Sequence, residues 1–556
     1  MRKVIAQCWK WGLSVLFGIG VFLFWYVAYP HALSYQEQYQ LFLWTGDYFW
    51  ERLSVPGGLA DWLGEFVVQF YYVEWLGALL LAILFVSLQR ITGTVLVILF
   101  SEKMVSRRTV HMISVIFSFF PSLFLVWLMG DPSVLLSLTV AVILALAVFL
   151  LMRHVPIGFD LLTIPVLYWL IGPMAWLYVI LRIVRWSWKH VWSAGWMLAV
   201  QLMAYAFLLP QWPLQSVMAG MGYYRVPLQW PSLTGYDKDM YELIRQDYLV
   251  RNERWDEIVK RAGETQVRTP FWSNCVNLAL AEKRLLADRM FDFYQSGVEA
   301  LIMPRTRDLT SMLPSAEAFW HLGMVNSAQR YMFDTQESIL NGRKSGRCTK
   351  RIAECMIVNG HYKTAAKQIG LLKKSLFYRA WAEEADAMLG DEAKINAHPV
   401  YGRLRKLRYQ ENFLYSYEEI DKMFGLLFMR SLESGDRSQE TGDRSLETGV
   451  RSQETGDRSL ETGVRRQESG DRRQETGDGR QEVNMMALDY FMGQMLLKGN
   501  VQGFQQYMGW VQQYGGYRQM PLGYQDVARC IQMRGNVPGS PYATYMQRIM
   551  ERRSAE

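Results

Sequence analysis

Four carboxylates in the segment 31–72 are of a residue type that can do chemistry at a membrane surface. They are Asp47, Glu51, Asp61 and Glu65, and they lie among tyrosine, tryptophan and phenylalanine residues. A carboxylate in such a place can accept a proton as a general base or can hold a divalent cation. These four residues are therefore the candidate catalytic residues of the chain.

Two interpretations of this segment are open. In the first, it resembles the first external loop of polytopic glycosyltransferases that use lipid-linked sugars, in which acidic residues bind metal or deprotonate the acceptor. In the second, it is an interfacial amphipathic helix with its aromatic residues at headgroup depth and its acidic residues facing water. We favour the second, because the segment has no Asp-x-Asp or Glu-x-Asp pair and the chain has few spans for such an enzyme.

The rest of the chain has no recognised catalytic, metal or cofactor signature. The patterns HExxH, GxSxG and GxxxxGK[ST] are absent, and none of the five cysteines belongs to a CxxC pair. We therefore expect no cofactor, no metal and only structural thiols. The basic segment GRKSGR (342–347) could bind an anionic partner or a phosphate, but a solvated loop between two helices is the simpler interpretation.

Long apolar stretches in residues 1–210 predict a transmembrane helical domain, because about 20 apolar residues cross the hydrocarbon core of a bilayer. The sequence predicts seven spans, at 11–30, 73–90, 113–130, 133–154, 157–171, 173–186 and 191–210. The stretch 155–185 could instead be a single span, which would give six. That reading places Arg182 and Arg185 outside, against the positive-inside tendency, whereas a break at Gly172-Pro173 favours seven. Seven spans put the C-terminal half outside the cell membrane, and six put it in the cytoplasm.

Asp160 interrupts one of these apolar stretches. Carboxylates within the membrane are functional candidates, but Asp160 is only a few positions from the predicted inner interface. We expect its side chain to reach the water of the headgroup layer.

The second half of the chain has helical periodicity, with apolar residues at three- and four-residue intervals. Paired helices are predicted in 237–264, 274–297, 316–338 and 349–375, and a glycine followed by a packed residue begins the second helix of several pairs. The repeated positions are Gly323, Val325 and Ala328; Gly360, Tyr362 and Ala365; and Gly499, Val501 and Phe504. The pattern resembles tetratricopeptide-type (TPR-like) α-α repeats in degenerate form, which present a concave surface to a partner.

Several blocks together resemble a family of uncharacterised integral membrane proteins from Gram-negative bacteria, which combine a polytopic N-terminal half with a TPR-like C-terminal half. The blocks are PGGLADWLGEFVVQFYYVEWLGALLLA (56–82), NLALAEKRLLADRMFDFYQSG (277–297), FWHLGMVNSAQRYMFDT (319–335) and NGHYKTAAKQIGLLKKSLFYRAWA (359–382). The resemblance implies an inner-membrane location. It implies no activity and no catalytic residues.

A heptad repeat, R-[SR]-[LQ]-E-[ST]-G-[DV], runs from Arg430 to Asp478. A coiled coil needs two apolar positions in each heptad, but the whole tract has only a few scattered leucines and valines, and each heptad contains one helix-weakening glycine. The composition predicts disorder. Because helices are predicted on both sides, the tract should be an expanded surface loop, and deleting 432–480 should leave folding and function nearly intact.

The sequence thus predicts an all-α protein of four parts: a transmembrane domain at 1–210, a TPR-like domain at 211–429, a disordered tract at 430–482 and a continuation of the helical repeats at 483–556. The net charge of +7 is accounted for by cytoplasmic loops, and nothing indicates nucleic-acid binding. We expect a multi-pass protein of the bacterial inner membrane whose partners are the lipid bilayer and proteins bound on a periplasmic helical-repeat surface. The alternative is a membrane glycosyltransferase or polysaccharide-assembly enzyme that uses the acidic loop.

Overall fold

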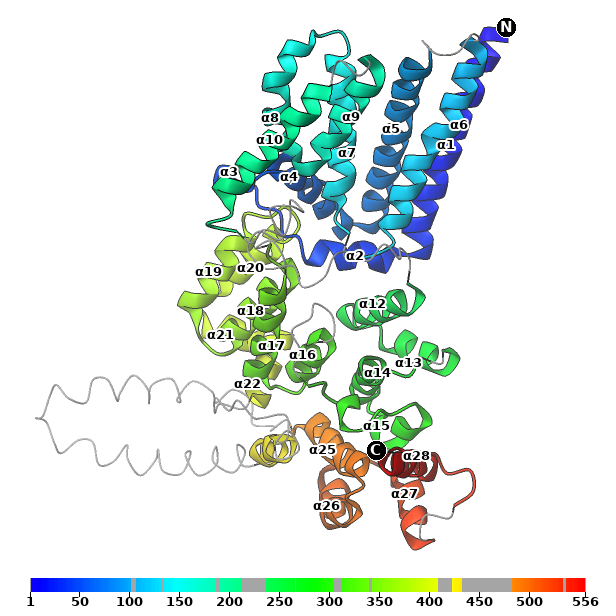
Figure 1. Ribbon diagram of the computed structural model, residues 1–556. Helices are drawn as coiled ribbons and strands as arrows, with labels where there is room; N and C mark the ends of the chain where they lie inside the picture. The colour runs from blue at the N-terminus through cyan, green and yellow to red at the C-terminus, as the bar shows by residue number, and fades with distance from the viewer. Residues whose placement is uncertain are drawn as a thin grey trace, which may run out of the picture. The chain divides into compact units, whose positions relative to one another are not determined.

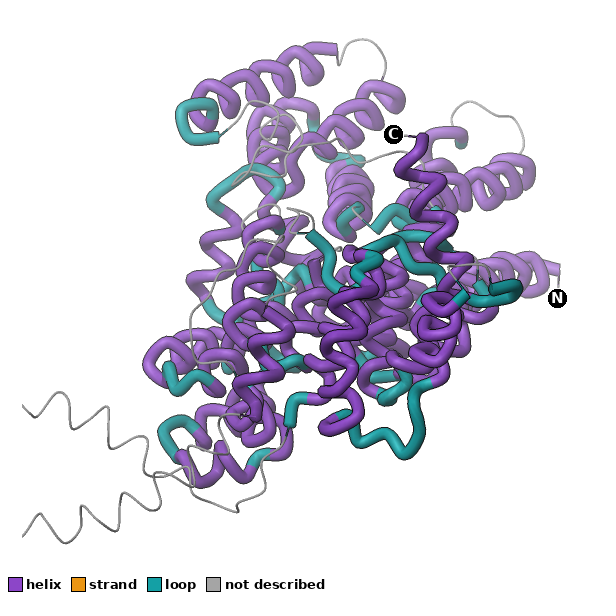
Figure 2. Tube along the Cα trace, turned by 90° about the horizontal axis from the view of Figure 1, so that it is seen from below, coloured by secondary structure: helices purple, strands orange, loops and turns teal. Residues whose placement is uncertain are grey.

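The computed structural model describes residues 2–101, 107–132, 134–186, 191–212, 237–265, 267–304, 312–339, 343–408, 423–432, 483–533 and 537–555. These residues form helices, turns and loops and contain no strand (Figure 2), which confirms the all-α prediction for the described part of the chain. The helices belong to two compact units that interleave along the sequence. One unit contains 1–248, 332–353 and 362–389, and the other contains 249–331, 354–361 and 390–556.

The helices are named in chain order in Figure 1. Those that begin in the first unit are α1 (Arg2–Leu23), α2 (Pro30–Gln38), α3 (Gly46–Leu53), α4 (Gly58–Val68), α5 (Glu74–Phe100), α6 (Arg107–Leu128), α7 (Leu136–Met152), α8 (Asp160–Ile171), α9 (Ala175–Trp186), α10 (Val191–Leu208), α12 (Lys238–Arg251), α18 (Gly346–Val358), α19 (Tyr362–Leu372) and α20 (Arg379–Met388). Those that begin in the second unit are α13 (Trp255–Glu264), α14 (Pro270–Glu282), α15 (Leu286–Arg289), α16 (Met312–His321), α17 (Val325–Ser338), α21 (Glu392–Ala397), α22 (Pro399–Leu407), α25 (Met485–Lys498), α26 (Val501–Tyr514), α27 (Leu522–Gln532) and α28 (Pro541–Ala555). Short turns of 3-10 or π-helix lie at Phe24–Ala28, Gln69–Tyr72, Ile157–Phe159, Gly172–Met174, Met290–Asp292 and Val298–Ala300.

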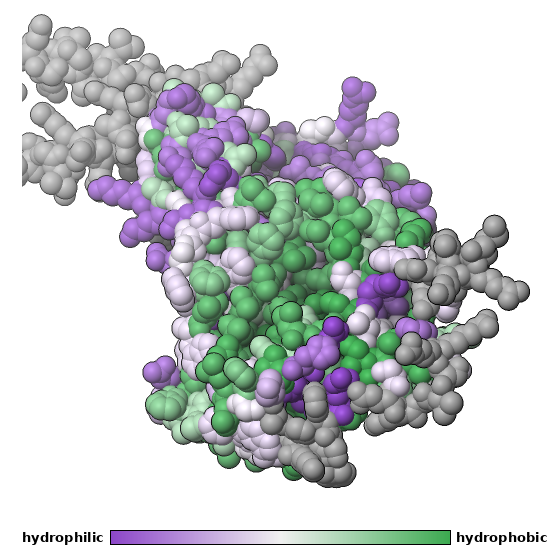
Figure 3. Space-filling model, turned by 90° about the horizontal axis from the view of Figure 1, so that it is seen from above, coloured by the Kyte–Doolittle hydropathy of each residue, from purple (hydrophilic) through white to green (hydrophobic). Residues whose placement is uncertain are grey.

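Five helical stretches of the described chain are long and apolar enough to cross a membrane. They are Trp11–Ala28, Glu74–Phe100, Thr109–Leu128, Asp160–Arg185 and Val191–Leu208, and α7 is apolar but shorter. Large apolar side chains lie on the outside of these helices, as with Phe120 and Phe207, which are 74% and 81% exposed. Figure 3 views the molecule from the upper ends of the helices in Figure 1 and shows apolar side chains over the middle of that face. An exterior of this kind fits a lipid environment.

The stretch 160–185 is not one straight helix. It breaks where the sequence predicted, because Gly172 has a φ of +66° and separates α8 from α9. A continuous helix would place Asp160 and Arg182 about 33 Å apart, yet their side chains form an ion pair at 3.2 Å. The two helices therefore fold back on each other as a hairpin.

The expectation that Asp160 reaches headgroup water is wrong. Its side chain is buried, pairs with Arg182 and accepts a hydrogen bond from the Tyr178 hydroxyl at 2.7 Å. Arg182 also donates to the carbonyl of Met152, the last residue of α7, at 2.8 Å and to that of Val155, just beyond α7, at 3.1 Å. The carboxylate thus holds an arginine that caps a helix end, and the pair ties the hairpin to α7.

A chain of polar side chains joins α1, α5 and α6 inside the apolar bundle. The Ser14 hydroxyl donates to the Gln89 carbonyl oxygen at 2.8 Å, and the Gln89 amide donates to the Ser118 hydroxyl at 2.6 Å. All three side chains are buried. Hydrogen bonds of this kind hold membrane helices together where apolar contacts alone do not distinguish a helix from lipid.

Helix pairs occur in each stretch where the sequence predicted them, and the same turn ends the first helix of five pairs. In each, the residue after the turn donates its backbone N–H to a carbonyl five positions earlier, as in Met324 to Phe319 and His361 to Met356, both at 2.8 Å. The residue before that donor has a positive φ, which is the geometry of a Schellman cap. The five positive-φ residues are Glu253, Arg284, Gly323, Gly360 and Gly499. The sequence identified the three glycines but not Glu253 and Arg284.

Most of the heptad tract, 433–482, lies outside the described residues, so its predicted disorder stays a prediction. The helix Met423–Leu432 ends just before it, and α25 begins just after it. The Asn484 backbone N–H donates to the Ser431 hydroxyl at 3.1 Å. The two ends of the tract are therefore in contact, as expected for an insertion in a loop.

Candidate functional site

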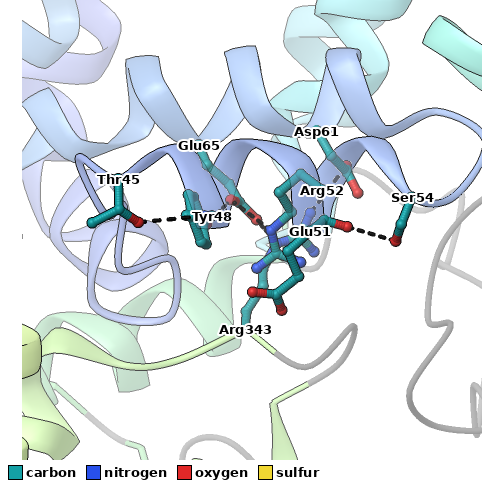
Figure 4. Close-up of polar contacts among 8 residues, drawn as sticks. All are labelled: Thr45, Tyr48, Glu51, Arg52, Ser54, Asp61, Glu65 and Arg343. Atoms are coloured by element: carbon teal, nitrogen blue, oxygen red, sulfur yellow. Dashed lines mark hydrogen bonds and ion pairs between the residues drawn. The ribbon is translucent and has the colours of Figure 1, made fainter.

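Two short helices of the segment 31–72 carry the predicted acidic residues. The Thr45 side chain caps α3 by accepting the Tyr48 backbone N–H at 3.3 Å. The chain then reverses at Gly57, whose φ is +87°, and at Gly58, where a Cβ would overlap the Arg52 carbonyl. This turn lays α4 back along α3 (Figure 4).

Four side chains of this helix pair face one another. Tyr48 and Arg52 are one turn apart on α3, and Asp61 and Glu65 are one turn apart on α4. The Tyr48 hydroxyl donates to Glu65 Oε2, and Arg52 Nε pairs with the same oxygen at 3.2 Å. All four are buried.

Arg343 completes the cluster from a segment 278 residues further along the chain (Figure 4). Its Nε donates to Glu65 Oε1, and its Nη2 pairs with Asp61 Oδ1 at 3.0 Å. The guanidinium fork therefore holds one carboxylate with each of two nitrogens, a geometry that arginine can form and lysine cannot. Only 4% of the Arg343 side chain is exposed.

The charges of this cluster balance, with two arginines against two carboxylates. Burial by itself would raise the pKa of Glu65, but Arg52 and Arg343 offset it and hold the pKa below its ordinary value. Burial and the Glu65 charge raise the pKa of the Tyr48 phenol. Both oxygens of Glu65 are occupied by strong donors, so this carboxylate is a weak base with no free position for a metal. The arrangement is suited to holding two segments of chain together.

The four candidate residues therefore fall into two groups. Asp61 and Glu65 are buried and ion-paired, so they do not face water as the amphipathic-helix interpretation expects. Asp47 and Glu51 are exposed on α3, as that interpretation expects. Among the described residues, no three histidine, cysteine or acidic side chains are grouped closely enough to hold a metal ion.

The prediction of a solvated loop at 342–347 is wrong for both arginines that the structure describes there. Like Arg343, Arg347 is buried, and its Nη1 donates to Asp247 Oδ2 at 2.7 Å and to Gln38 Oε1 at 3.0 Å. The Tyr378 hydroxyl donates to Glu37 Oε1 at 2.9 Å. The anionic partners of this basic segment are carboxylates of the same chain.

Backbone contacts reinforce the ion pairs. Leu41 donates its N–H to the Lys344 carbonyl, and Trp44 donates to the Lys374 carbonyl, both at 2.8 Å. The segment that follows the first apolar helix is thus fixed to the start of α18 and to the turn between α19 and α20 by charges, by the Tyr378 hydroxyl and by the backbone. We call this set of contacts the docking cluster and define it by Arg52, Asp61, Glu65, Arg343 and Arg347.

A model of a family described as one of unknown function, DUF6057, matches residues 5–434. The match covers 430 of the 556 residues. The chain belongs to the DUF6057 family. No curated protein and no solved structure matches it.

The DUF6057 match includes the docking cluster and ends at 434, four residues after the heptad tract begins. It therefore spans all of the first unit except residues 1–4 and stops short of α25 to α28. The family description gives no activity, so the chemistry of the site has to be inferred from the contacts themselves.

Proposed function

We propose that this DUF6057 protein is a membrane-anchored helical-repeat scaffold that presents a protein-binding surface on the periplasmic side of the bacterial inner membrane. The observation that carries the proposal is the docking cluster. Its buried ion pairs fix the start of α18, and hydrogen bonds from Trp44 and to Glu37 fix the α19–α20 turn, so these helices are held at a set place next to the segment between α1 and α5. A surface held in this way is suited to positioning a partner relative to the membrane.

The docking cluster also supports the predicted side of the C-terminal half. The segment 31–72 and the segment 343–378 contact each other, so both belong on one side of the bilayer. If α8 and α9 form a hairpin that starts and ends on one side, the membrane crossings between the two segments are made by α5, α6, α7 and α10. Their number is even, so both segments lie on the same side. A single crossing by 155–185 gives an odd number and would separate them. Each hairpin helix is about 18 Å long, so we favour a hairpin that dips into the hydrocarbon core.

The recurring Schellman turn supports the TPR-like reading, because a stack of equivalent helix pairs repeats the same cap at each first helix. The resemblance of four sequence blocks to Gram-negative membrane proteins supports a location in the bacterial inner membrane.

A reporter fused after Glu556 should give a periplasmic signal, and one inserted after Arg153 should give a cytoplasmic signal. Equal signals from both sites would refute this topology.

The exposed face of α19 and α20 is the surface that we assign to the partner. Lys363 and Lys367 are exposed on α19, and Glu383 and Glu384 are exposed on the antiparallel α20. Exposed cations on one helix and exposed carboxylates on its neighbour favour a partner that carries both charges and disfavour proteins of uniform charge.

Photo-crosslinking in cells tests this assignment. A crosslinker at Lys367 or Glu384 should give a discrete protein adduct, and a crosslinker at Leu162, which is 70% exposed on the apolar exterior, should not. The charge reversal Glu383→Lys, with the crosslinker kept at Lys367, should abolish the adduct without lowering protein abundance. Recovery of no protein adduct from either face position, or the same adduct from Leu162, would count against the scaffold.

A second candidate function is favoured by the exposure of Asp47 and Glu51. As an enzyme of glycan assembly, the chain would have to use these two, because Asp61 and Glu65 are occupied in ion pairs. Asp47→Asn or Glu51→Gln would then abolish a cell-surface glycan at unchanged protein abundance. If both variants retain every surface glycan, the enzyme reading fails and the scaffold remains.

A further inference from the structure

The turn between α19 and α20, residues 373–378, is fixed next to the beginning of an apolar helix. The Lys374 carbonyl accepts the Trp44 backbone N–H, and the Phe377 ring stacks on Tyr72 with centroids 5.1 Å apart. Phe377 also meets the edge of Phe70 at 5.9 Å. These contacts come from two sides of the turn, so its depth relative to α5 is fixed by the fold.

The depth of α5 in a bilayer is indicated by its own sequence. The candidate span begins at Glu74, and the aromatic side chains around that point, Tyr72 and Trp75, are 46% and 51% exposed. Exposed tyrosine and tryptophan at the end of an apolar helix lie at the level of the lipid headgroups. The turn that packs on Tyr72 therefore lies at headgroup level as well.

The side chains that this turn exposes fit that environment. Leu376 is 46% exposed, and the neighbouring Trp44 is 51% exposed. Lys374 and Arg379 are exposed, and neither forms an ion pair with a carboxylate in the described part of the chain. Arg379 Nε donates to the Lys373 carbonyl at 3.1 Å, which holds its guanidinium over the turn. An exposed leucine between an aromatic ring and two cations is typical of segments that insert shallowly into a bilayer with anionic lipids.

We propose that the α19–α20 turn is a lipid-binding site, in which Leu376 and Trp44 enter the headgroup layer and Lys374 and Arg379 bind the phosphates of anionic lipids. The docking cluster holds the α19–α20 pair to the segment 31–72, and the lipid-binding site adds a direct contact between this pair and the outer surface of the membrane. It requires α5 to span the bilayer, but it does not depend on a protein partner. Each basic residue at an anionic surface strengthens attachment about fivefold.

Spin-label accessibility on the full chain tests the proposal. The background variant is Cys8→Ser, because the other four cysteines are buried and will not be labelled. The label is placed at Leu376→Cys, with Ala387→Cys, exposed further along α20, as the matched aqueous control and Ile83→Cys on the apolar exterior of α5 as the matched membrane control. Samples are nanodiscs of phosphatidylglycerol and phosphatidylethanolamine or of phosphatidylcholine alone.

In the anionic nanodiscs, the label at 376 should collide more often with oxygen than with a water-soluble nickel chelate, whereas the label at 387 should show the reverse. In phosphatidylcholine, or with Lys374→Glu and Arg379→Glu, the oxygen preference at 376 should fall several-fold. If the label at 376 is exposed to water while the label at 83 is buried in lipid, the lipid-binding site is refuted, but α5 still spans the membrane. A buried label at 376 that ignores both lipid charge and charge reversal would overturn the assignment of the two cations to lipid phosphates.

Discussion

Removal of Arg343 is the sharpest test of the docking cluster. Arg343→Ala leaves Asp61 and Glu65 buried with a single arginine, Arg52. The net charge of the four groups Arg52, Asp61, Glu65 and Arg343 therefore falls from zero to minus one. Breaking a buried ion pair from one side costs about 3–5 kcal/mol, which is a large part of the roughly 5–15 kcal/mol that stabilises a folded protein. We expect a loss of this size in the free energy of unfolding of the purified protein in detergent.

A conservative variant and a matched control test whether the loss comes from the forked ion pair. Arg343→Lys should recover only part of the loss, because one ammonium cannot serve two carboxylates with a planar fork. Asp386→Asn breaks the Lys373–Asp386 pair in the same unit, whose side chains are 36% and 43% exposed, and should cost less than about 1 kcal/mol.

The dependence on pH gives an independent check of the same cluster. The pKa of Glu65 is lowered in the folded protein, so its contribution is present above the ordinary carboxylate pKa and is lost as pH falls through the folded value. The penalty of Arg343→Ala should therefore shrink as pH falls below the ordinary pKa of a glutamate carboxyl. A penalty below about 1 kcal/mol at pH 7, or strict additivity of Arg343→Ala with Glu65→Gln, would refute a coupled cluster.

Four further changes have defined outcomes. Burial raises the pKa of Asp489 to about 6, so its stabilising contribution is lost as pH rises through that value. The free energy of unfolding of Asp489→Asn, measured relative to wild type by thermal unfolding, should therefore rise by on the order of 2–3 kcal/mol between pH 4 and pH 8. Gly64→Ala places a Cβ 2.9 Å from the backbone nitrogen at the start of α7 and should cost about 1–3 kcal/mol, whereas Gly195→Ala, which meets no atom within 4 Å, should be neutral by the same assay. Glu253→Gly relieves a φ of +53° and should stabilise the protein by up to about 1 kcal/mol in denaturant titrations; a loss would show that the glutamate side chain matters more than the backbone. Deletion of 433–482 with a four-residue linker should leave stability unchanged or raise it by up to about 2 kcal/mol, and a lowered midpoint would mean that the tract supports the fold.

Local features of this fold were predictable from sequence because each depends on neighbouring residues. The hairpin break follows from Gly172 before a proline, and three of the five Schellman turns follow from a glycine after a helical stretch. Glu253 and Arg284 take the same backbone conformation without that signal, because hydrogen bonds of the helix end impose it on a residue that does not prefer it. The sequence indicated these two turns only through the predicted helices on either side of them.

The docking cluster was only half predictable. The sequence drew attention to Asp61 and Glu65 as acidic residues near a membrane and to Arg343 as part of a basic segment. It gave no reason to join them, because periodicity describes one element at a time and 278 residues separate Glu65 from Arg343. Arg182 and Asp160 show the same limit over a shorter distance, since their pairing requires the hairpin to exist.

Ion pairs have a specific advantage in this place. A segment at the edge of a bilayer that exposed apolar side chains for docking could bury them equally well in lipid, so apolar contacts would not select one arrangement. Asp61 and Glu65 gain nothing from lipid, and once they are removed from water they are satisfied only by donors at a matching spacing. Arg343 supplies such a fork, and Arg347 adds a second buried contact through a single nitrogen, Nη1, which donates to Asp247 and Gln38. We infer that charge complementarity fixes where α18 and the α19–α20 turn dock, which is the property that the proposed scaffold would need.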